Sequence, residues 1–364
     1  MSKKKPRIYI GINEVGDYTL NITRGFRALG YQVTNAVLAT DSPIHRFRER
    51  HDRYIRRGAG AFTTLLHRFL EFGRVAPFHD IFIFLFSESF SPSSLLASKN
   101  RLARWLAYRD LAVLRAMGKK IVIVTNGCDV MHHSIIGREA KKDGFEYYVC
   151  LECDAKEDCS LPLKTEKIDR IDSYADYIFS TPLMAVPFKK KSITFSLPVN
   201  ISATKYSFTA TDNPLVLHAP TNKSIKGTKY IVEAAERLKK EGHSFRFLLC
   251  ENMTNAMVRQ KLEESEVVAD QILARGHGLF ALEALASGNV VLNHAVPGRY
   301  GYPSDQPFIV TTPKTIYDNL KMVLENPELR KEKAKEGRAY VEKYHDHVAI
   351  ARKFLEKIGE HPPD

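Results

Sequence analysis

The chain has 364 residues, of which 44% are hydrophobic and 26% charged, with 20 Gly and 17 Pro. This length predicts two domains, each large enough for its own core, and the composition excludes disordered, collagen-like and disulfide-stapled proteins. The longest apolar runs, such as residues 81–86, are about six residues long, far below the roughly 20 needed for a helix to cross a bilayer. The N-terminus has no apolar stretch of signal-peptide length, so we expect a cytoplasmic protein.

The net charge is +12, and the first 200 residues, with 31 basic and 21 acidic side chains, carry most of it. Positive charge is most concentrated in the segment from Arg46 to Arg57, where aromatic residues lie among six arginines: Arg46, Arg48, Arg50, Arg53, Arg56 and Arg57. Such a segment fits a surface that meets phosphate, and it fits an ordinary solvated face equally well.

Short β-branched or aromatic runs alternate with helical patterns along the chain. The expected strands are residues 7–12, 80–86, 120–125, 176–181, 214–220, 245–250, 289–294 and 308–312. Helices are expected at 102–118 and 228–242, each stopping at a glycine, and at 347–358. Continuous apolar strands between amphipathic helices are typical of a parallel sheet covered on both faces, so the predicted class is α/β.

The best domain boundary is the Pro- and Ser/Thr/Asn-containing stretch at residues 197–213. We therefore expect an N-terminal domain at 1–198 and a C-terminal domain at 199–345, both doubly wound and facing each other across a cleft. The final segment, 346–364, contains a helix that can pack on either domain.

Two loops that follow strands have the chemistry of a nucleotide site. In the first, Lys223 and Lys226 lie beside Gly227 at the start of a helix, where ammonium groups and free N–H groups favour a diphosphate. Surface lysines give the same pattern.

In the second loop, glycines precede a helix that begins at Leu279 and Phe280. Gly276 and Gly278 allow close approach of the backbone, and Glu283 can accept both hydroxyls of a ribose. A glutamate that merely favours a helix N-terminus is the alternative.

Together these segments, HAPTNKSIKGTKYIVEAAERL and LFALEALASGNVV, resemble the retaining GT-B glycosyltransferases of family 4, in a bacterial polysaccharide-type branch. The resemblance covers residues 216–300 well and the N-terminal half loosely. It implies two Rossmann-like domains, an N-terminal one for a glycan or lipid-linked acceptor and a C-terminal one for a nucleoside diphosphate sugar. It also implies hexose transfer with retention and no metal in catalysis, and it supports action at the inner face of an anionic membrane. We expect no nucleic-acid partner, because the sequence has no zinc-finger, RRM or KH pattern.

The sequence departs from that family at the expected catalytic centre. Arg275 stands where the first of two glutamates is usual, so Arg275 is expected on phosphate and Asp270 is the nearest carboxylate that could replace the glutamate. Asn126 takes the place of a frequent histidine, and Asp129 follows it. The N-terminal glycine-rich loop is reduced to a stretch that includes Asn13 and Gly16. We therefore take Asn126, Asp129 and Asp270 as catalytic candidates only.

Other functions remain open at this point. A sugar-nucleotide epimerase would share the architecture, but the sequence has no clear cluster of carboxylates and histidines for it. A catalytically silent sugar-nucleotide-binding protein fits the departures. A nucleic-acid binder fits the charge but not the Gly-rich loop with Glu283.

Cysteines form one further pattern. Cys150, Cys153 and Cys159 are spaced as C-x2-C-x5-C, and Cys128 precedes His132 and His133. In a cytoplasmic protein these residues are free thiols or ligands of a structural zinc ion.

Overall fold

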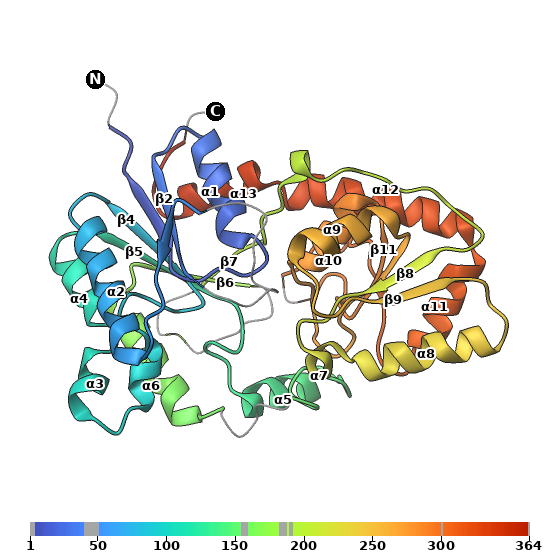
Figure 1. Ribbon diagram of the computed structural model, residues 1–364, viewed down its shortest axis with the longest axis horizontal. Helices are drawn as coiled ribbons and strands as arrows, with labels where there is room; N and C mark the ends of the chain where they lie inside the picture. The colour runs from blue at the N-terminus through green and yellow to red at the C-terminus, as the bar shows by residue number, and fades with distance from the viewer. Residues whose placement is uncertain are drawn as a thin grey trace.

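The computed structural model describes residues 4–39, 51–153, 159–181, 188, 192–299 and 301–362. Figure 1 shows two α/β domains side by side, each built around a parallel sheet, with both chain termini at the first domain. The predicted α/β class is confirmed. Within the described part of the chain, no helix is both long enough and apolar enough to span a membrane.

The first domain has a seven-stranded sheet in the order β3-β2-β1-β4-β5-β6-β7. Its strands are β1 (Ile8–Gly11), β2 (Val33–Leu38), β3 (Arg53–Ile55), β4 (Ile81–Leu85), β5 (Lys120–Thr125), β6 (Tyr177–Ser180) and β7 (Ile193–Thr194). Its helices are α1 (Tyr18–Ala28), α2 (Ala61–Val75), α3 (Arg101–Leu106), α4 (Arg109–Ala116), α5 (His133–Lys142) and α6 (Leu161–Tyr174), and a 3-10 turn spans Ser93–Ala97.

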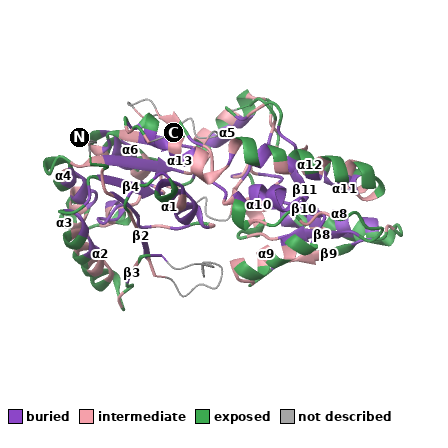
Figure 2. Cartoon of the chain, turned by 90° about the horizontal axis from the view of Figure 1, so that it is seen from above, coloured by how far each residue is buried: buried purple, intermediate pink, exposed green. Residues whose placement is uncertain are grey.

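The central strands are buried on both faces because the two faces support separate cores. Along β4, Phe82 and Phe84 enter one hydrophobic cluster, whereas Ile81, Ile83 and Leu85 enter the cluster on the opposite face. Burying such a side chain contributes about 1.5–3 kcal/mol. Figure 2 shows the result as buried strands lying inside more exposed helices.

The second domain has a five-stranded sheet in the order β12-β11-β10-β8-β9. Its strands are β8 (Leu215–His218), β9 (Arg246–Leu249), β10 (Val267–Ala269), β11 (Val290–Asn293) and β12 (Ile309–Val310). Its helices are α7 (Lys223–Lys226), α8 (Thr228–Lys240), α9 (Asn255–Glu264), α10 (Leu279–Ser287), α11 (Ile316–Glu325) and α12 (Pro327–Tyr344), preceded by a 3-10 turn at Ile201–Ala203.

The last helix, α13 (His347–Lys357), returns to the first domain and packs on α1 (Figure 1). Phe354 stacks on Phe179 with ring centroids 4.2 Å apart. Gly25 permits the close approach, because a Cβ atom there would lie 2.6 Å from the Cβ atom of Ala351. Of the two domains that the C-terminal helix could join, it therefore joins the first.

The structure differs from the predicted elements in two respects. The helix expected at 102–118 is two helices, α3 and α4, because Tyr108 has a left-handed backbone with φ of 61° and its hydroxyl donates to the Ser87 carbonyl at 2.5 Å. The sequence pattern also does not predict β2, β3, β7 and β10. Three of these have only two or three residues, and polar residues interrupt β2.

Glu14 caps α1 from the loop that follows β1. Its carboxylate accepts hydrogen bonds from the backbone N–H groups of Val15 at 2.7 Å, Thr19 at 3.1 Å and Leu20 at 3.2 Å, and from the Thr19 hydroxyl. Burial nevertheless raises the pKa of Glu14 from 4.5 to about 7, and the hydrogen bonds with Thr19 only partly offset it.

This raised pKa predicts a pH-dependent contribution to stability. The folded state holds the Glu14 proton more tightly than the unfolded state, so the contribution is complete below about pH 4.5 and is lost as the pH rises to about 7. Its upper limit is about 3 kcal/mol, since a change of one in pKa corresponds to about 1.4 kcal/mol. In urea unfolding at about pH 5 and about pH 8, Glu14→Gln should lose less stability with rising pH than the parent does. An equal loss in both proteins would contradict this assignment.

Candidate active site

A cavity of about 520 Å³ lies between the two domains. Its walls are loops that follow β1, β4, β5 and β6 of the first sheet and β8, β9 and β10 of the second, together with α9 and α10. The carboxyl ends of both sheets therefore face the same space, where ligands of open α/β sheets bind. The volume is in the range of small-molecule sites.

Lys226 reaches this cavity from the end of α7. Its ammonium group is held by Asp270 Oδ1 at 2.7 Å and by Gln271 Oε1 at 2.9 Å. Gly227 follows in the left-handed region, with φ of 76°, and a Cβ atom there would lie 2.7 Å from Ile272 Cγ1, so only glycine fits. Lys226 thus places a cation at the cavity, and Asp270 and Gln271 hold its ammonium group in position.

The other half of the Asp270 carboxylate accepts a hydrogen bond from Asn293 Nδ2 at 2.9 Å. Asp270 is 1% exposed and does not line the cavity. The structure therefore gives this catalytic candidate a different position: it holds Lys226 rather than facing a ligand.

The structure separates the two lysines that the sequence places together. Lys223 lies outside the cavity, is exposed, and forms an ion pair with Glu251. The two lysines are the first and last residues of α7, and only Lys226 lines the cavity.

Glu283 lies in α10 and lines the cavity as a buried carboxylate. It pairs with Arg259 of α9, and the same guanidinium lies 2.8 Å from Asp17 Oδ2 in the first domain. Burial raises the pKa of Glu283 to about 7, Arg259 opposes this shift, and Asp17 adds to it. Arg259 therefore links the two walls of the cleft through two carboxylates.

Arg275 also crosses the cleft. Its guanidinium lies 3.5 Å from Asp143 Oδ2 and 5.1 Å from the centre of the Phe145 ring, both in the segment after α5. Gly278 lines the cavity beside it, whereas Gly276 does not; the Gly276 N–H donates to the His294 carbonyl at 3.1 Å. Leu279 and Phe280 complete this wall.

The first domain contributes Gly16 and Asn126 to the cavity lining, but not Asn13 or Asp129. A Cβ atom on Gly16 would lie 3.4 Å from Leu279 Cδ1, so Gly16 is packed against the opposite wall. A phosphate at the N-terminus of α1 would compete with the Glu14 carboxylate, which already occupies those N–H groups.

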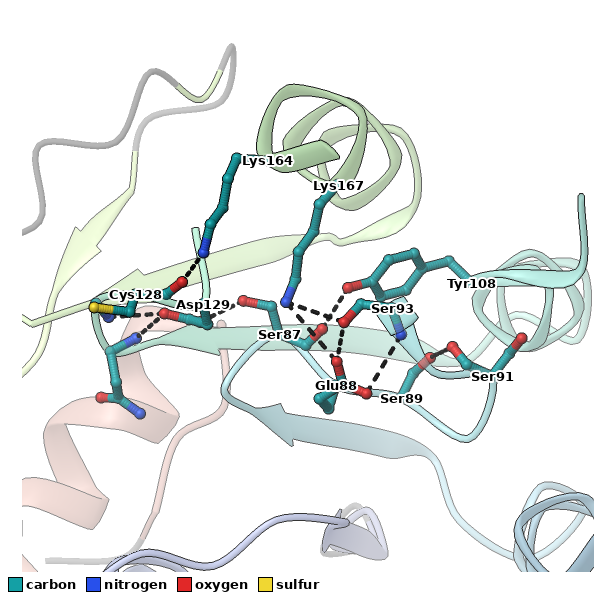
Figure 3. A network of polar contacts seen from close by, with 12 residues as sticks. Ser87, Glu88, Ser89, Ser91, Ser93, Tyr108, Cys128, Asp129, Lys164 and Lys167 are labelled. Atoms are coloured by element: carbon teal, nitrogen blue, oxygen red, sulfur yellow. Dashed lines mark hydrogen bonds and ion pairs between the residues drawn. The ribbon is translucent and has the colours of Figure 1, made fainter. Parts of the chain in front are cut away.

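Asp129 shapes the loop that carries Asn126 (Figure 3). Its carboxylate accepts the Gly127 N–H at 2.7 Å, the Asn126 N–H at 3.1 Å and the Ser87 hydroxyl at 2.5 Å. Asn126 is thereby fixed, and its side-chain Nδ2 is buried without a hydrogen-bond partner among the described residues. Asp129 is a positioning residue, and Asn126 offers an unused donor at the cleft.

Several cavity residues were not found from the sequence. Asn252 and Asn255 follow β9, and the rule that ligands lie beyond strand ends would have indicated them. The sequence did not indicate Arg259 as a cavity residue, because a basic residue on the polar helix α9 is expected to be an ordinary surface residue. His277 and Tyr302 also line the cavity, and burial holds the pKa of His277 far below its usual value.

The chain superposes along nearly its whole length on solved structures. Sucrose-phosphate synthase from Thermosynechococcus elongatus matches 97% of this chain and 98% of its own, with a TM-score of 0.59 at 13% identity. Anabaena HepE, solved in complex with UDP-glucose, matches 98% of this chain and 100% of its own, with a TM-score of 0.61 at 11% identity. The fold is GT-B.

A third GT-B structure, S. aureus TarM with UDP, matches 82% of this chain and 59% of its own, with a TM-score of 0.53 at 13% identity. No protein-family model matches the sequence, and no curated protein matches it. At these identities the likeness shows the GT-B fold alone.

Proposed function

We propose that this GT-B protein is a retaining glycosyltransferase that moves a hexose from a nucleoside diphosphate sugar to a glycan or lipid-linked acceptor. One observation carries the proposal: the cleft brings a fixed ammonium group, Lys226, and a buried carboxylate, Glu283, to the carboxyl edge of the second sheet. HepE, with the same fold, was solved with UDP-glucose, and the family 4 resemblance assigns these two positions to the diphosphate and the ribose.

The arrangement accounts for departure of the nucleoside diphosphate. Negative charge grows on the diphosphate as the bond to the sugar breaks, and preorganised cations stabilise that charge without reorganisation. Lys226 and the backbone of the loop at Gly278 would meet it, with Arg275 close by. The acceptor hydroxyl would attack on the face from which the diphosphate leaves, so that no side chain has to act as a nucleophile.

A sugar-nucleotide-binding protein without turnover is the second candidate. The observation that favours it is Arg275, which stands where the family has a glutamate and is paired with Asp143 across the cleft. An arginine there supplies charge for phosphate but no carboxylate for the sugar.

A thermal-shift screen against UDP, GDP, ADP and their hexose conjugates tests the donor class. A ligand at about 100 times its dissociation constant stabilises the folded protein by about 2.7 kcal/mol. We expect one nucleoside diphosphate and its sugar conjugates to raise the Tm of the protein clearly more than the matching nucleoside does. Equal Tm values with all of them would contradict the proposal.

We further propose that the protein meets an anionic membrane at its inner face through the segment from Arg46 to Arg57 and the adjoining helix α2. Residues 46–50 lie outside the described residues. Arg56 lies beside α2, because its carbonyl oxygen is 3.1 Å from Nδ1 of His67 on that helix. On α2 the spacing of Phe62, Leu66 and Leu70 gives one exposed apolar stripe, a pattern that enters lipid headgroups beside basic residues.

Vesicle co-sedimentation tests the membrane proposal. Each basic residue near an anionic surface contributes about 1 kcal/mol, so Arg56→Glu with Arg57→Glu should weaken partitioning to anionic vesicles at least tenfold, to about the level seen at high salt. Lys239→Glu with Lys240→Glu, on α8, makes the same charge change in the other domain and should leave partitioning nearly unchanged. Equal binding to neutral and anionic vesicles would contradict it.

A further inference from the structure

The two walls of the cavity differ in chemical character. Four charged side chains of the second domain line it: Lys226, Arg259, Arg275 and Glu283. Among the described residues of the first domain, Glu139 is the only lining residue with a charged side chain. The first-domain wall is otherwise largely apolar, and the family 4 resemblance assigns this half of the cleft to the acceptor.

The hydrophobic core of the first domain is open to the cavity beside α5. Met131 and Ile136 belong to the cluster that contains Phe82 and Phe84, and Val149 packs against that cluster. All three side chains also line the cavity. Because they are held by a close-packed interior, they form a preformed apolar surface and not a loose one.

The cysteine pattern adjoins the loop that carries Met131. The Cys159 thiol is 4.0 Å from the Met131 carbonyl oxygen, and its sulfur lies within 4.8 Å of donor atoms of His132 and His133. Cys150 is instead buried in the hydrophobic core. These contacts pack the loop in place, and the structural zinc ion expected from the cysteine spacing stays a prediction.

Val15 and Phe86 extend the apolar wall from the loops that follow β1 and β4. Phe86 is only partly buried against the cluster on the other face of the sheet. Val15 lines the cavity and is nevertheless 44% exposed. Removing such surface from water favours the binding of an apolar group.

Two buried polar atoms on this wall have no hydrogen-bond partner among the described residues. They are the Tyr18 hydroxyl and Nδ2 of Asn126, and both residues line the cavity. Burial raises the pKa of Tyr18 well above its usual value, so its hydroxyl keeps its proton and can donate. Buried polar atoms are almost always paired, so these two donors indicate that a ligand oxygen lies beside the apolar surface.

We propose that the acceptor is an uncharged alcohol or phenol whose apolar body lies against Met131, Ile136 and Val15, with its hydroxyl at Asn126 and Tyr18. This inference rests on the proposed function and narrows its acceptor to a molecule whose apolar part itself enters the cleft. The acceptor oxygen would form the bond to the anomeric carbon, the bond from that carbon to the diphosphate would break, and the hydroxyl proton would pass to the departing diphosphate.

The same wall disfavours two other acceptor classes. Sugar hydroxyls held against the apolar side chains would lose their hydrogen bonds to water without replacement, which weakens binding. A phosphorylated or acidic acceptor would find Glu139 on this wall and no cation among its described lining residues.

A set of four probes tests the acceptor class. Isothermal titration measures binding of 1-octanol, 2-naphthol, methyl glucoside and glucose 6-phosphate to the full-length protein, with and without the nucleotide that stabilises it most. Several apolar contacts, each worth about tenfold or more, should make one of the two apolar probes bind at least about 100-fold more tightly than the two sugars. Preference for 1-octanol indicates a lipid alcohol, and preference for 2-naphthol an aromatic acceptor.

The contradicting results are distinct for the two proposals. If either sugar binds as tightly as both apolar probes, the acceptor class is wrong, even where the nucleotide binds. If no nucleotide binds, the proposed function fails, and the comparison without nucleotide still decides the character of the wall.

A matched pair of variants tests the position of the apolar body. Val15→Asn places an uncharged polar group on the wall and should weaken binding of the preferred apolar probe about tenfold. Val113→Asn makes the same change on α4, at a valine that is 46% exposed and outside the cavity lining, and should bind the probe as the parent does. Unchanged binding in Val15→Asn, or an equal loss in Val113→Asn, would overturn the proposal.

Discussion

Lys226→Met should both destabilise the protein and weaken binding of the nucleoside diphosphate. The variant leaves Asp270, a carboxylate that is 1% exposed, without its cation. Removing one partner of a buried pair costs about 3–5 kcal/mol. A charge-assisted hydrogen bond to phosphate contributes about 1.5–3 kcal/mol, so the affinity should fall by roughly 10- to 100-fold. Urea unfolding measures the first effect and isothermal titration calorimetry the second.

A second substitution separates these two effects. In Lys226→Met with Asp270→Asn, the buried charge is gone, so most of the stability should return while the affinity for the diphosphate stays low. Lys223→Met alters the lysine that pairs with Glu251 outside the cavity and should change both quantities little. If Lys223→Met weakens binding more than Lys226→Met does, the diphosphate lies elsewhere.

Glu283→Gln should lower the affinity for the donor nucleotide by roughly 10- to 100-fold with the fold retained. Gln keeps the shape of the side chain but loses the charge that strengthens hydrogen bonds to the two ribose hydroxyls, a contribution of about 1.5–3 kcal/mol. Because burial raises the pKa of Glu283 to about 7, the ionised form increases as the pH rises through that value. Affinity should therefore increase with pH in the parent, and less in Glu283→Gln, when both are titrated with the same nucleotide.

Glu14→Gln is the matched control. Glu14 is also buried and its pKa is also raised to about 7, but it lies outside the cavity lining and caps α1. We expect this variant to bind the nucleotide as the parent does. If Glu283→Gln also binds as the parent does, the ribose is not at Glu283.

The pattern of apolar runs predicted the α/β architecture. Strands of a parallel sheet with helices on both faces are buried on both sides, so they appear in the sequence as continuous apolar runs. All eight expected strands are present, and the glycine after each of the first two expected helices has positive φ, at Gly118 and Gly242. The break at Tyr108 was not predictable, since it depends on a hydrogen bond with Ser87, distant in sequence. Short edge strands such as β7 carry too few residues for a pattern.

The sequence placed candidate residues at the cavity where those residues lie close together in the chain. The Lys226–Gly227 turn and the junction of Gly278 with α10 each lie within one segment, and the structure brings Lys226 and Glu283 to one cavity. The pairings across the cleft could not be predicted, because Arg259 meets Asp17 and Arg275 meets Asp143 only after the domains assemble. The position of Asp270 could not be predicted either. Its contact with Lys226 depends on the pairing of the neighbouring strands β8 and β10, which the sequence does not show.

Turnover of a nucleoside diphosphate hexose tests the central claim most directly. The protein is incubated with the sugar conjugate of the nucleotide that stabilises it most, and proton NMR follows donor consumption and the anomer first released. The account predicts that free nucleoside diphosphate appears, that the released or transferred sugar first has the anomeric configuration of the donor, and that Glu283→Gln is slower at low donor concentration. A donor that binds but stays intact, with and without glycan and lipid-linked acceptors, or a first-formed sugar of the opposite configuration, would contradict the account.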